Sequence, residues 1–544
     1  MELKHIVLFL SFSLVFCSSN SRILTNEQIA NKIDEYVGGL LQCRKFIGAN
    51  LAVVKNGSVI LTKGYGLANV RRNESVTTNN KFPIASITKS FTALLVMKLL
   101  TEKQISIDTK VKDLWSGYTA WSGYRYHDLT LRDFLAHKTG TPRHDFILIL
   151  GGQNRENVVN KIRFLRPNLS PRIEHQYHNL FYVLSGKIAE VIADNGKDWE
   201  NLIEDNFFKP IGMENSGFYD KQDNYNGFVS PYVPSSNGTH VNLVEYPADV
   251  WRNVGRAGPS GSIVSTAYDM GKWLAMILNR GVALNGKRIL TEEAIERVFA
   301  NEISFNDFIP ELLGNKPELG KRTSYGLGFW NGYQSGVEFH QHGGDLTGFH
   351  STHILIRSIK SGFSFSTNHG QQSLERAILE NSIHDILMGR DPSISLDEAC
   401  NSALYENHNS DTTFPNIQNI PKYSELIKIQ RFNNNNITKY TGKYDNWAYG
   451  SISVKSTGAA IFRLSLDYGN MGRFNLLPTE NDTYIGISKP GPSAIIPNMI
   501  FHFEDEQHGR MNKLVALSFE ILDPPIFERS LGPEPPVYHE KCSD

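Results

Sequence analysis

Ser86 and Lys89 lie three residues apart in the stretch PIASITKSFTALLVMKLL, which begins at Pro83. Residues at positions i and i+3 share one face of a helix, so Lys89 can come within hydrogen-bond reach of the Ser86 hydroxyl. A serine becomes a nucleophile when a neighbouring group takes its proton and nearby donors stabilise the oxyanion that forms. Because the same spacing also arises by chance at a solvated helix start, the pair alone does not define an active site.

Two later motifs strengthen the case for chemistry. The sequence SITK at 86–89 is followed by YHN at 177–179 and HGG at 342–344, and the three resemble the motifs of the serine β-lactamase-like and penicillin-binding-protein family, in its class C branch. The connecting segments TLRDFLAHKTGTP, GRAGPSGSIVSTAYDMGKWL, YGLGFW and HGGDLTGFHS are also similar to those of the family. The resemblance covers roughly residues 24–391.

The resemblance implies a role for each residue of the first two motifs. Ser86 would be the nucleophile that becomes acylated, and Lys89 would hold or relay its proton. Tyr177 would act as general base and acid, as in class C members, and Asn179 would position an amide of the substrate.

The third motif departs from the Lys-Thr-Gly that is usual in the family. After His342, the glycines Gly343 and Gly344 suit close backbone approach, and the N–H groups of Asp345 and Ser86 would form the oxyanion hole. A lysine there helps β-lactamases to hold a substrate carboxylate, whereas histidine, with a reference pKa of about 6.5, is largely neutral at physiological pH. Since esterase-like and peptidase-like relatives carry histidine at this place, we expect hydrolysis of an ester or amide rather than of penicillin.

The same residues also have plainer interpretations. Tyr177 suits a half-buried core position, and Asn179 suits the N-cap of the helix that follows. His340 and His342 alternate as H-x-H, which suggests a zinc pair, but no carboxylate or further histidine stands at a recognisable ligand spacing. We therefore predict no metal and no cofactor. The other histidines near the motifs are expected in loops and at the surface, namely His137, His144, His175 and His178.

Local sequence signals predict the elements that would position these groups. Two β-branched runs surround Asn56-Gly57, which is a strong hairpin signal. The apolar residues that follow Ser86 recur at helical spacing, which predicts a helix there. Thr130 and Asp133 form a capping box at the start of a second helix. A further helix is expected to end at Asn195-Gly196.

Strand character returns in residues 339–370, with a turn at 360–362. Strands at both ends and helices between them predict an α+β fold, in which distant parts of the chain complete one antiparallel sheet and leave a cleft beside the helices. With the resemblance, this indicates a β-lactamase-like/transpeptidase fold over residues 24–395. An Asn-rich linker is expected at 396–437, and a small all-β, barrel-like domain at 438–544.

Composition and charge restrict the function classes. The 544 residues are 40% hydrophobic, and 55 Lys and Arg nearly balance 56 Asp and Glu. This chain has no basic surplus for nucleic acid or an anionic membrane, so neither is expected as a partner. The apolar run near the start is far shorter than the roughly 20 residues of a membrane span.

The first residues instead predict a secretory signal peptide at 1–19, with Lys4 before the apolar run and small residues after it. Its removal leaves Cys43, Cys400 and Cys542, of which two at most can form one internal disulfide; their spacing does not choose the pair. Sequons that suit a secreted glycoprotein stand at Asn56, Asn73, Asn168, Asn237, Asn436 and Asn481.

Two functions remain open from the sequence. The first is a secreted serine hydrolase that acts on a small-molecule or peptide ester or amide through an acyl-serine intermediate. The second is an extracellular matrix protein with weak or no activity that uses the fold as a scaffold, since secreted members of the family occur in mollusc shell matrix, the gigasin type. An intact Ser, Lys, Tyr and Asn set favours the enzyme. The β domain resembles a barrel appended to some relatives, where it covers the cleft or helps assembly, but it carries no obvious catalytic cluster of its own.

Overall fold

The structure is a computed structural model that describes residues 24–118, 127–149, 154–221, 226–234, 243–245, 257–305, 319–370, 373–401, 436–458, 463–469, 472–479, 481–488 and 499–532. The predicted signal peptide, Asn237, Cys542 and most of the predicted linker lie outside these residues. Within the described ranges, no helix has the length and hydropathy of a membrane span.

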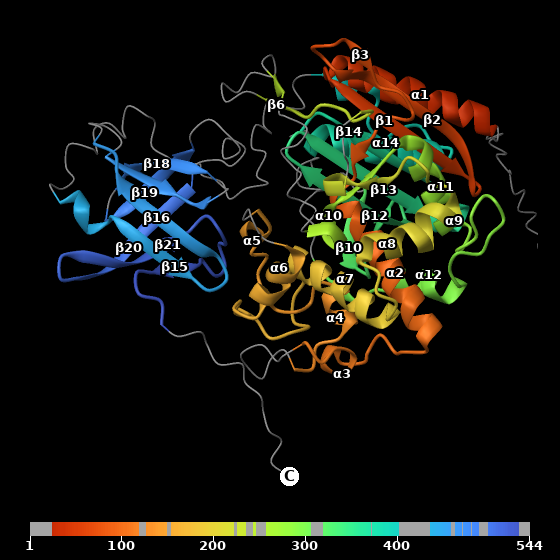
Figure 1. The fold of residues 1–544 in the computed structure, drawn as a ribbon. Helices are drawn as coiled ribbons and strands as arrows, with labels where there is room; N and C mark the ends of the chain where they lie inside the picture. Colours follow the sequence, from red (N-terminus) through yellow and green to blue (C-terminus); the bar gives the residue numbers. More distant parts are fainter. Residues whose placement is uncertain are drawn as a thin grey trace, which may run out of the picture.

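A nine-stranded antiparallel sheet lies at the centre of the first domain, in the order β3-β2-β1-β14-β13-β12-β11-β10-β9 (Figure 1). β1 pairs with β2 on one side and with β14 on the other, so the two ends of the domain complete one sheet, as the sequence predicts. The strands are β1 (Gly48–Lys55), β2 (Ser58–Asn69), β3 (Glu74–Ser75), β9 (Ile303–Ser304), β10 (Lys321–Tyr325), β11 (Trp330–Gln334), β12 (Val337–Leu346), β13 (Phe349–Ile356) and β14 (Ser361–Thr367).

The predicted hairpin joins β1 to β2. Asn56 and Gly57 both have positive φ, at 52° and 75°, as a tight turn between twisted strands requires. β1 is buried on both faces because helices cover the sheet on each side. Its Leu51 and Val53 pack in one apolar cluster, whereas Val54 belongs to another.

The helices form a layer on each face of the sheet (Figure 1). α1 and α14 pack on the Leu51 face, and α11 lies against β1 and β2 on the opposite one. The longer helices are α1 (Asn26–Cys43), α2 (Thr88–Lys103), α6 (Arg155–Ile162), α7 (Asn179–Ala193), α11 (Ala267–Leu278), α12 (Glu292–Phe299) and α14 (Ser373–Leu387). The short ones are η1 (Ala85–Ile87), α3 (Val111–Leu114), α4 (Leu131–Leu135), α5 (Phe146–Ile149), α8 (Trp199–Ile203), η2 (Glu204–Phe208), α9 (Lys209–Ile211), η3 (Tyr219–Lys221), α10 (Gly258–Gly261), η5 (Arg357–Ile359), α15 (Leu396–Cys400) and η7 (Ile437–Lys439).

α2 runs through the middle of the domain and is buried on nearly every side from Thr88 to Leu100. A helix that is apolar all round belongs in a core, and its neighbours α7, α10 and α12 hold it there. The predicted capping box of Thr130 and Asp133 begins α4, and α7 ends at Ala193 with Asp194 in the left-handed conformation, two residues before the predicted stop begins. Smaller sheets join β4 (Phe82–Pro83), β8 (Ile263–Ser265) and β5 (Gly217–Phe218), and β6 (Tyr232–Pro234) with β7 (Leu243–Glu245).

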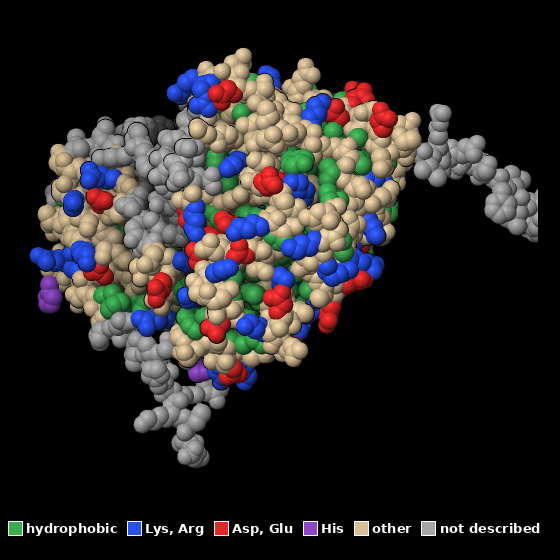
Figure 2. Space-filling model, turned by 45° about the vertical axis from the view of Figure 1, so that its right-hand side comes forward, with side chains coloured by type: hydrophobic (Ala, Val, Ile, Leu, Met, Phe, Trp, Pro, Cys, Tyr) green, Lys and Arg blue, Asp and Glu red, His purple; other side chains and the backbone are tan. Residues whose placement is uncertain are grey.

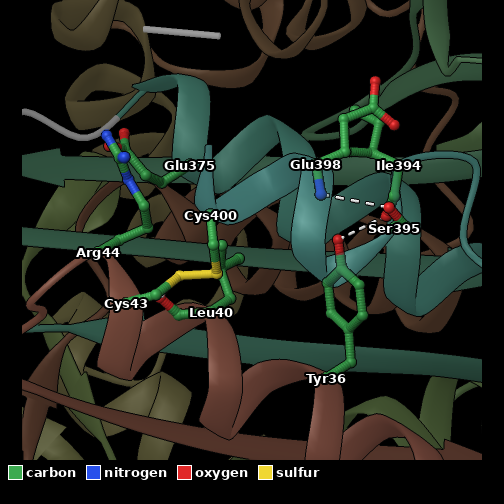
Figure 3. The surroundings of a disulfide bond; sticks show 9 residues. All are labelled: Tyr36, Leu40, Cys43, Arg44, Glu375, Ile394, Ser395, Glu398 and Cys400. Atoms are coloured by element: carbon green, nitrogen blue, oxygen red, sulfur yellow. Dashed lines mark hydrogen bonds and ion pairs between the residues drawn. A yellow bond between two sulfur atoms is a disulfide. The ribbon is translucent and has the colours of Figure 1, made fainter. Parts of the chain in front are cut away.

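A disulfide between Cys43 and Cys400 joins the end of α1 to the end of α15 (Figure 3). Nearby, the Tyr36 hydroxyl donates to the carbonyl oxygen of Ile394, and Arg44 pairs with Glu375 of α14. The pairing that the sequence left open is thus settled. The predicted start of the linker at residue 396 is wrong, because α15 packs on α1 as part of the first domain.

The C-terminal domain is a closed eight-stranded barrel, as the sequence predicts. β15 pairs with β22 through Asp445 and Glu528, which closes the ring, and aromatic side chains such as Tyr444, Phe474 and Phe501 fill it. The strands are β15 (Gly442–Asn446), β16 (Gly450–Ser456), β17 (Leu464–Asp467), β18 (Arg473–Pro478), β19 (Thr483–Ser488), β20 (Met499–Gln507), β21 (Arg510–Ala516) and β22 (Ile526–Glu528). Figure 2 shows basic and acidic side chains interspersed over one face of the molecule, in keeping with the formal net charge of −1.

Candidate active site

Ser86 lies in the tight turn η1, immediately before α2. The backbone leading to it is fixed, because the N–H of Ile84 donates to the carbonyl oxygen of Ile263 at 3.0 Å. Ala85 has a φ of 46°, a left-handed conformation that a non-glycine residue holds only where its surroundings impose it. The turn therefore presents Ser86 in a constrained position at the start of a buried helix.

Lys89 is completely buried and points at Ser86. Its Nζ lies 3.0 Å from Ser86 Oγ and donates to the carbonyl oxygen of Ser260 at 2.8 Å. Burial lowers the pKa of Lys89 well below its ordinary value; the carboxylate of Asp145 opposes this shift, and the charge of Arg143 adds to it. A neutral amine, which can accept a proton, is therefore favoured beside the serine hydroxyl.

Tyr177 approaches the same hydroxyl from the segment before α7. Burial raises its pKa above its ordinary value, while a hydrogen bond with the Ser86 side chain acts in the opposite direction. Its ring lies 4.8 Å from Lys89 Nζ and 6.1 Å from the ring of His342. The phenol is thus protonated in the resting site, and three of the predicted residues meet around one hydroxyl.

Asn179 is the first residue of α7 and not its N-cap, so the capping interpretation is wrong. The cap is His178, whose Nδ1 accepts from the N–H of Leu180. The Asn179 side chain instead donates to Asp145 Oδ1 at 2.8 Å, and Asp145 also pairs with Arg143. The Arg143 guanidinium lies 4.9 Å from the centre of the Tyr177 ring.

The third motif lies on β12, beside η1. The Nε2 atom of His342 is 3.0 Å from the Tyr325 hydroxyl, and its Nδ1 contacts the carbonyl oxygen of Gly343 at 2.6 Å. Burial lowers the pKa of His342 well below its ordinary value, so the imidazole is neutral. A Cβ at Gly344 would collide with the carbonyl oxygen of Ile84, which explains the need for glycine there.

Asp345 follows on β12 and pairs with His350, which in turn contacts Arg376. β12 packs against η1, so the backbone of Asp345 and that of Ser86 belong to neighbouring elements. Their N–H groups as an oxyanion hole stay a prediction.

The expectation of surface histidines is wrong for three of the four. His137, His144 and His178 are buried, and only His175 is half-buried. One ring nitrogen of each buried histidine is engaged: His137 Nδ1 accepts from the N–H of His178 at 3.0 Å, His178 Nδ1 accepts from the N–H of Leu180, and His144 Nδ1 lies 2.7 Å from the Tyr449 hydroxyl. The Nε2 atoms of all three are buried without a hydrogen-bond partner among the described residues.

His340 contacts Asn331 Oδ1 at 2.8 Å rather than joining a metal site. Among the residues that the structure describes, no group of three or more His, Cys, Asp or Glu side chains is placed to hold a metal ion.

Three residues of this site were not named from the sequence, Arg143, Asp145 and Tyr325, and a fourth, His137, was expected at the surface. All lie in or next to segments that resemble the family, TLRDFLAHKTGTP and YGLGFW. Their position in these segments was a signal, but no spacing connected them to Ser86, because only the folded chain brings them together.

Comparison with known proteins identifies the family. The family model described as beta-lactamase matches residues 33–386, which is more than half of the chain, and the protein belongs to this family. It is 23% identical to the unguisins hydrolase of Aspergillus campestris over 355 residues, covering 62% of each chain. It is 28% identical to penicillin-binding protein 4 of Amycolatopsis lactamdurans over 253 residues, covering 45% of this chain and 62% of that one. The matches thus span less than two thirds of the length of these curated relatives.

Solved structures share the fold. The octameric penicillin-binding protein homologue from Pyrococcus abyssi has a TM-score of 0.55 at 21% identity, and covers 92% of this chain and 99% of its own. The D-amino acid amidase from Ochrobactrum anthropi, solved with L-phenylalanine amide, has a TM-score of 0.53 at 18% identity, and covers 66% of this chain and 97% of its own. The similarity to the Pyrococcus abyssi structure therefore extends beyond residues 33–386, which match the family model.

Proposed function

We propose that this protein is a secreted serine hydrolase that cleaves an ester or amide through an acyl-Ser86 intermediate. The observation that carries the proposal is the convergence of the Lys89 amine, 3.0 Å away, and the Tyr177 hydroxyl on Ser86 Oγ. Ser86 Oγ attacks the carbonyl carbon of the substrate, and its proton passes to Lys89 Nζ. As the bond to the leaving group breaks, Tyr177 gives that group a proton and is reprotonated from Lys89. Water then attacks the acyl carbon and gives a proton to Tyr177, which passes its own proton to Lys89. As the bond to Ser86 Oγ breaks, Lys89 returns that proton to Oγ and the acid is released.

The substrate class follows from the charges in the site. His342 is neutral where a lysine would hold a carboxylate, so a penicillin would lack that cationic partner. The similar proteins include an unguisins hydrolase and a D-amino acid amidase. These support a small-molecule or peptide ester or amide as the substrate.

Two features support secretion. The Cys43–Cys400 disulfide suits an oxidising compartment. The sequon asparagines within the described residues, Asn56, Asn73, Asn168, Asn436 and Asn481, are all exposed, as attachment of a glycan requires.

The test is intact-mass spectrometry of the full chain after incubation with a fluorophosphonate probe and, separately, with a penicillin. We expect a phosphonyl adduct that maps to Ser86 and is absent from Ser86→Ala, together with slow or no labelling by the penicillin. A folded wild-type chain that forms no adduct with either reagent would contradict the hydrolase and favour the extracellular scaffold.

A further inference from the structure

Residues 141–146 of the first domain, which lie beside the site, contact the barrel. This segment supplies Arg143, over the Tyr177 ring, and Asp145, which accepts from the Asn179 side chain. It leads into α5, which lies close to the barrel in Figure 1. Its two charged residues thus touch the second catalytic motif directly.

Between these residues, His144 engages the barrel. Its ring is buried, and Nδ1 lies 2.7 Å from the Tyr449 hydroxyl. Its backbone N–H donates to the Glu520 carboxylate at 3.0 Å. A φ of 49° puts His144 in the left-handed region, which a histidine keeps only where its contacts hold it.

Aromatic packing extends the contact on both sides. Phe146 stacks on Phe519 with ring centres 4.7 Å apart, and Phe164 lies 5.9 Å from Trp447. Phe519 also packs on Tyr449 inside the barrel. The segment is therefore fixed to side chains that belong to the core of the second domain.

We infer that Tyr449 and Glu520 of the barrel are positioning residues for the active site, because they hold His144 and thereby place Arg143 and Asp145 against Tyr177 and Asn179. The inference rests on the proposed function of Ser86. A shift of about 1 Å in catalytic groups can lower a rate by up to about a hundredfold, so loosening this contact should slow the chemistry without touching Ser86 or Lys89.

The experiment compares full-length variants that each lose one group. Tyr449→Phe removes the hydroxyl that meets His144, and Glu520→Ala removes the acceptor of its N–H. Glu520→Gln keeps a carbonyl oxygen and should restore part of the rate. Tyr444→Phe is the matched control, because its hydroxyl is also buried in the barrel but donates to the carbonyl oxygens of Tyr440 and Met511 and accepts from Arg529.

The readouts are the maximum rate of fluorophosphonate labelling at Ser86 and hydrogen exchange of residues 141–146, at a temperature at which circular dichroism shows every variant folded. We expect Tyr449→Phe and Glu520→Ala to label on the order of tenfold more slowly than wild type. The peptide should also exchange faster in both, with Tyr444→Phe unchanged. If wild type labels and both variants label at its rate, the inference is overturned and the proposed function stands. An unlabelled wild-type chain overturns the proposed function, and this inference with it.

Discussion

The chemistry of single residues depends here on burial. Lys89 is completely buried and Tyr177 is half-buried beside Ser86. Burial disfavours the charged form of both the amine and the phenol. The amine therefore becomes a proton acceptor, while the phenol keeps its proton. His342 stays neutral for the same reason, which removes the positive charge found at this place in related β-lactamases.

The lowered pKa of Lys89 predicts a pH dependence for the reaction of Ser86. Below the folded-state pKa the amine is protonated and cannot accept the serine proton, so the labelling rate should fall as the pH falls through that value. It should level off above it. The measurement is the fluorophosphonate labelling rate across pH on folded wild type. Lys89→Arg, which carries a permanent charge, should show no labelling at any pH; a labelled arginine variant would refute the role of Lys89 as a proton acceptor.

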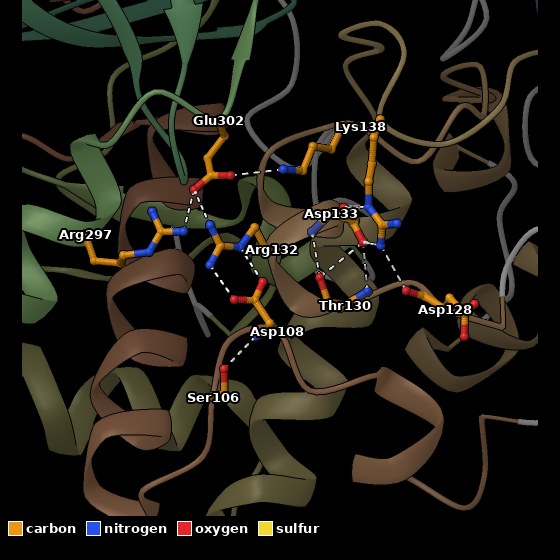
Figure 4. Close-up of polar contacts among 10 residues, drawn as sticks. Ser106, Asp108, Asp128, Thr130, Arg132, Asp133, Lys138, Arg297 and Glu302 are labelled. Atoms are coloured by element: carbon orange, nitrogen blue, oxygen red, sulfur yellow. Dashed lines mark hydrogen bonds and ion pairs between the residues drawn. The ribbon is translucent and has the colours of Figure 1, made fainter.

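At the scale of elements, an ionic network behind the site fixes the loop that carries His137. The side chain of Glu302 is only 5% exposed and contacts Arg132 at 3.3 Å, Lys138 at 2.9 Å and Arg297 at 2.5 Å (Figure 4). The backbone N–H of Glu302 also donates to the carbonyl oxygen of Tyr325, the partner of His342. The carboxylate of Glu302 thus connects α4 with α12, and its backbone N–H adds β10.

Removing this carboxylate should be costly. Glu302→Ala leaves three cations without their shared partner, and we expect it to lower the free energy of unfolding by about 3 kcal/mol, measured by urea denaturation. The control is Asp391→Asn. It removes an ion pair with Lys32, and the Asp391 side chain is 91% exposed. That variant should unfold at the wild-type urea concentration. Equal midpoints for the two variants would show that the network adds no stability.

The disulfide acts on a different pair of elements. It closes a separation of 357 residues between α1 and α15, and so restricts the unfolded chain strongly. The double variant Cys43→Ser/Cys400→Ser should lose about 2–5 kcal/mol of unfolding free energy. Reduction of wild type with dithiothreitol should reproduce the loss, and the same treatment should leave the double variant unchanged. A double variant as stable as oxidised wild type would contradict this expectation.

At the scale of the whole molecule, the exposed sequons give a test of the proposed secretion. Asn73 is exposed in the turn between β2 and β3, with a φ of 51°. Expression through a eukaryotic secretory pathway should give a chain heavier than its sequence mass, and a peptide glycosidase should reverse the increase. Asn73→Gln should remove one glycan. A secreted chain with the bare sequence mass would refute glycosylation.

Much of the fold follows from local sequence. The Asn56-Gly57 turn, the capping box of Thr130 and Asp133 and the apolar run after Ser86 each depend on residues a few positions apart, and each forms as predicted. The spacing of Ser86 and Lys89 also predicts their contact, because one helical turn fixes it.

Tertiary structure alone decided the rest. The burial of His137 and His144, the choice of Cys400 as the partner of Cys43, and the approach of Tyr325 to His342 all depend on segments far apart in the chain. No local periodicity records which distant group will meet a side chain. By itself the sequence therefore determined the elements and the contact between Ser86 and Lys89. Packing excludes water and brings distant charges together. It therefore decided the protonation of Lys89 and His342, the residues that surround the site and the contact of His144 with the barrel.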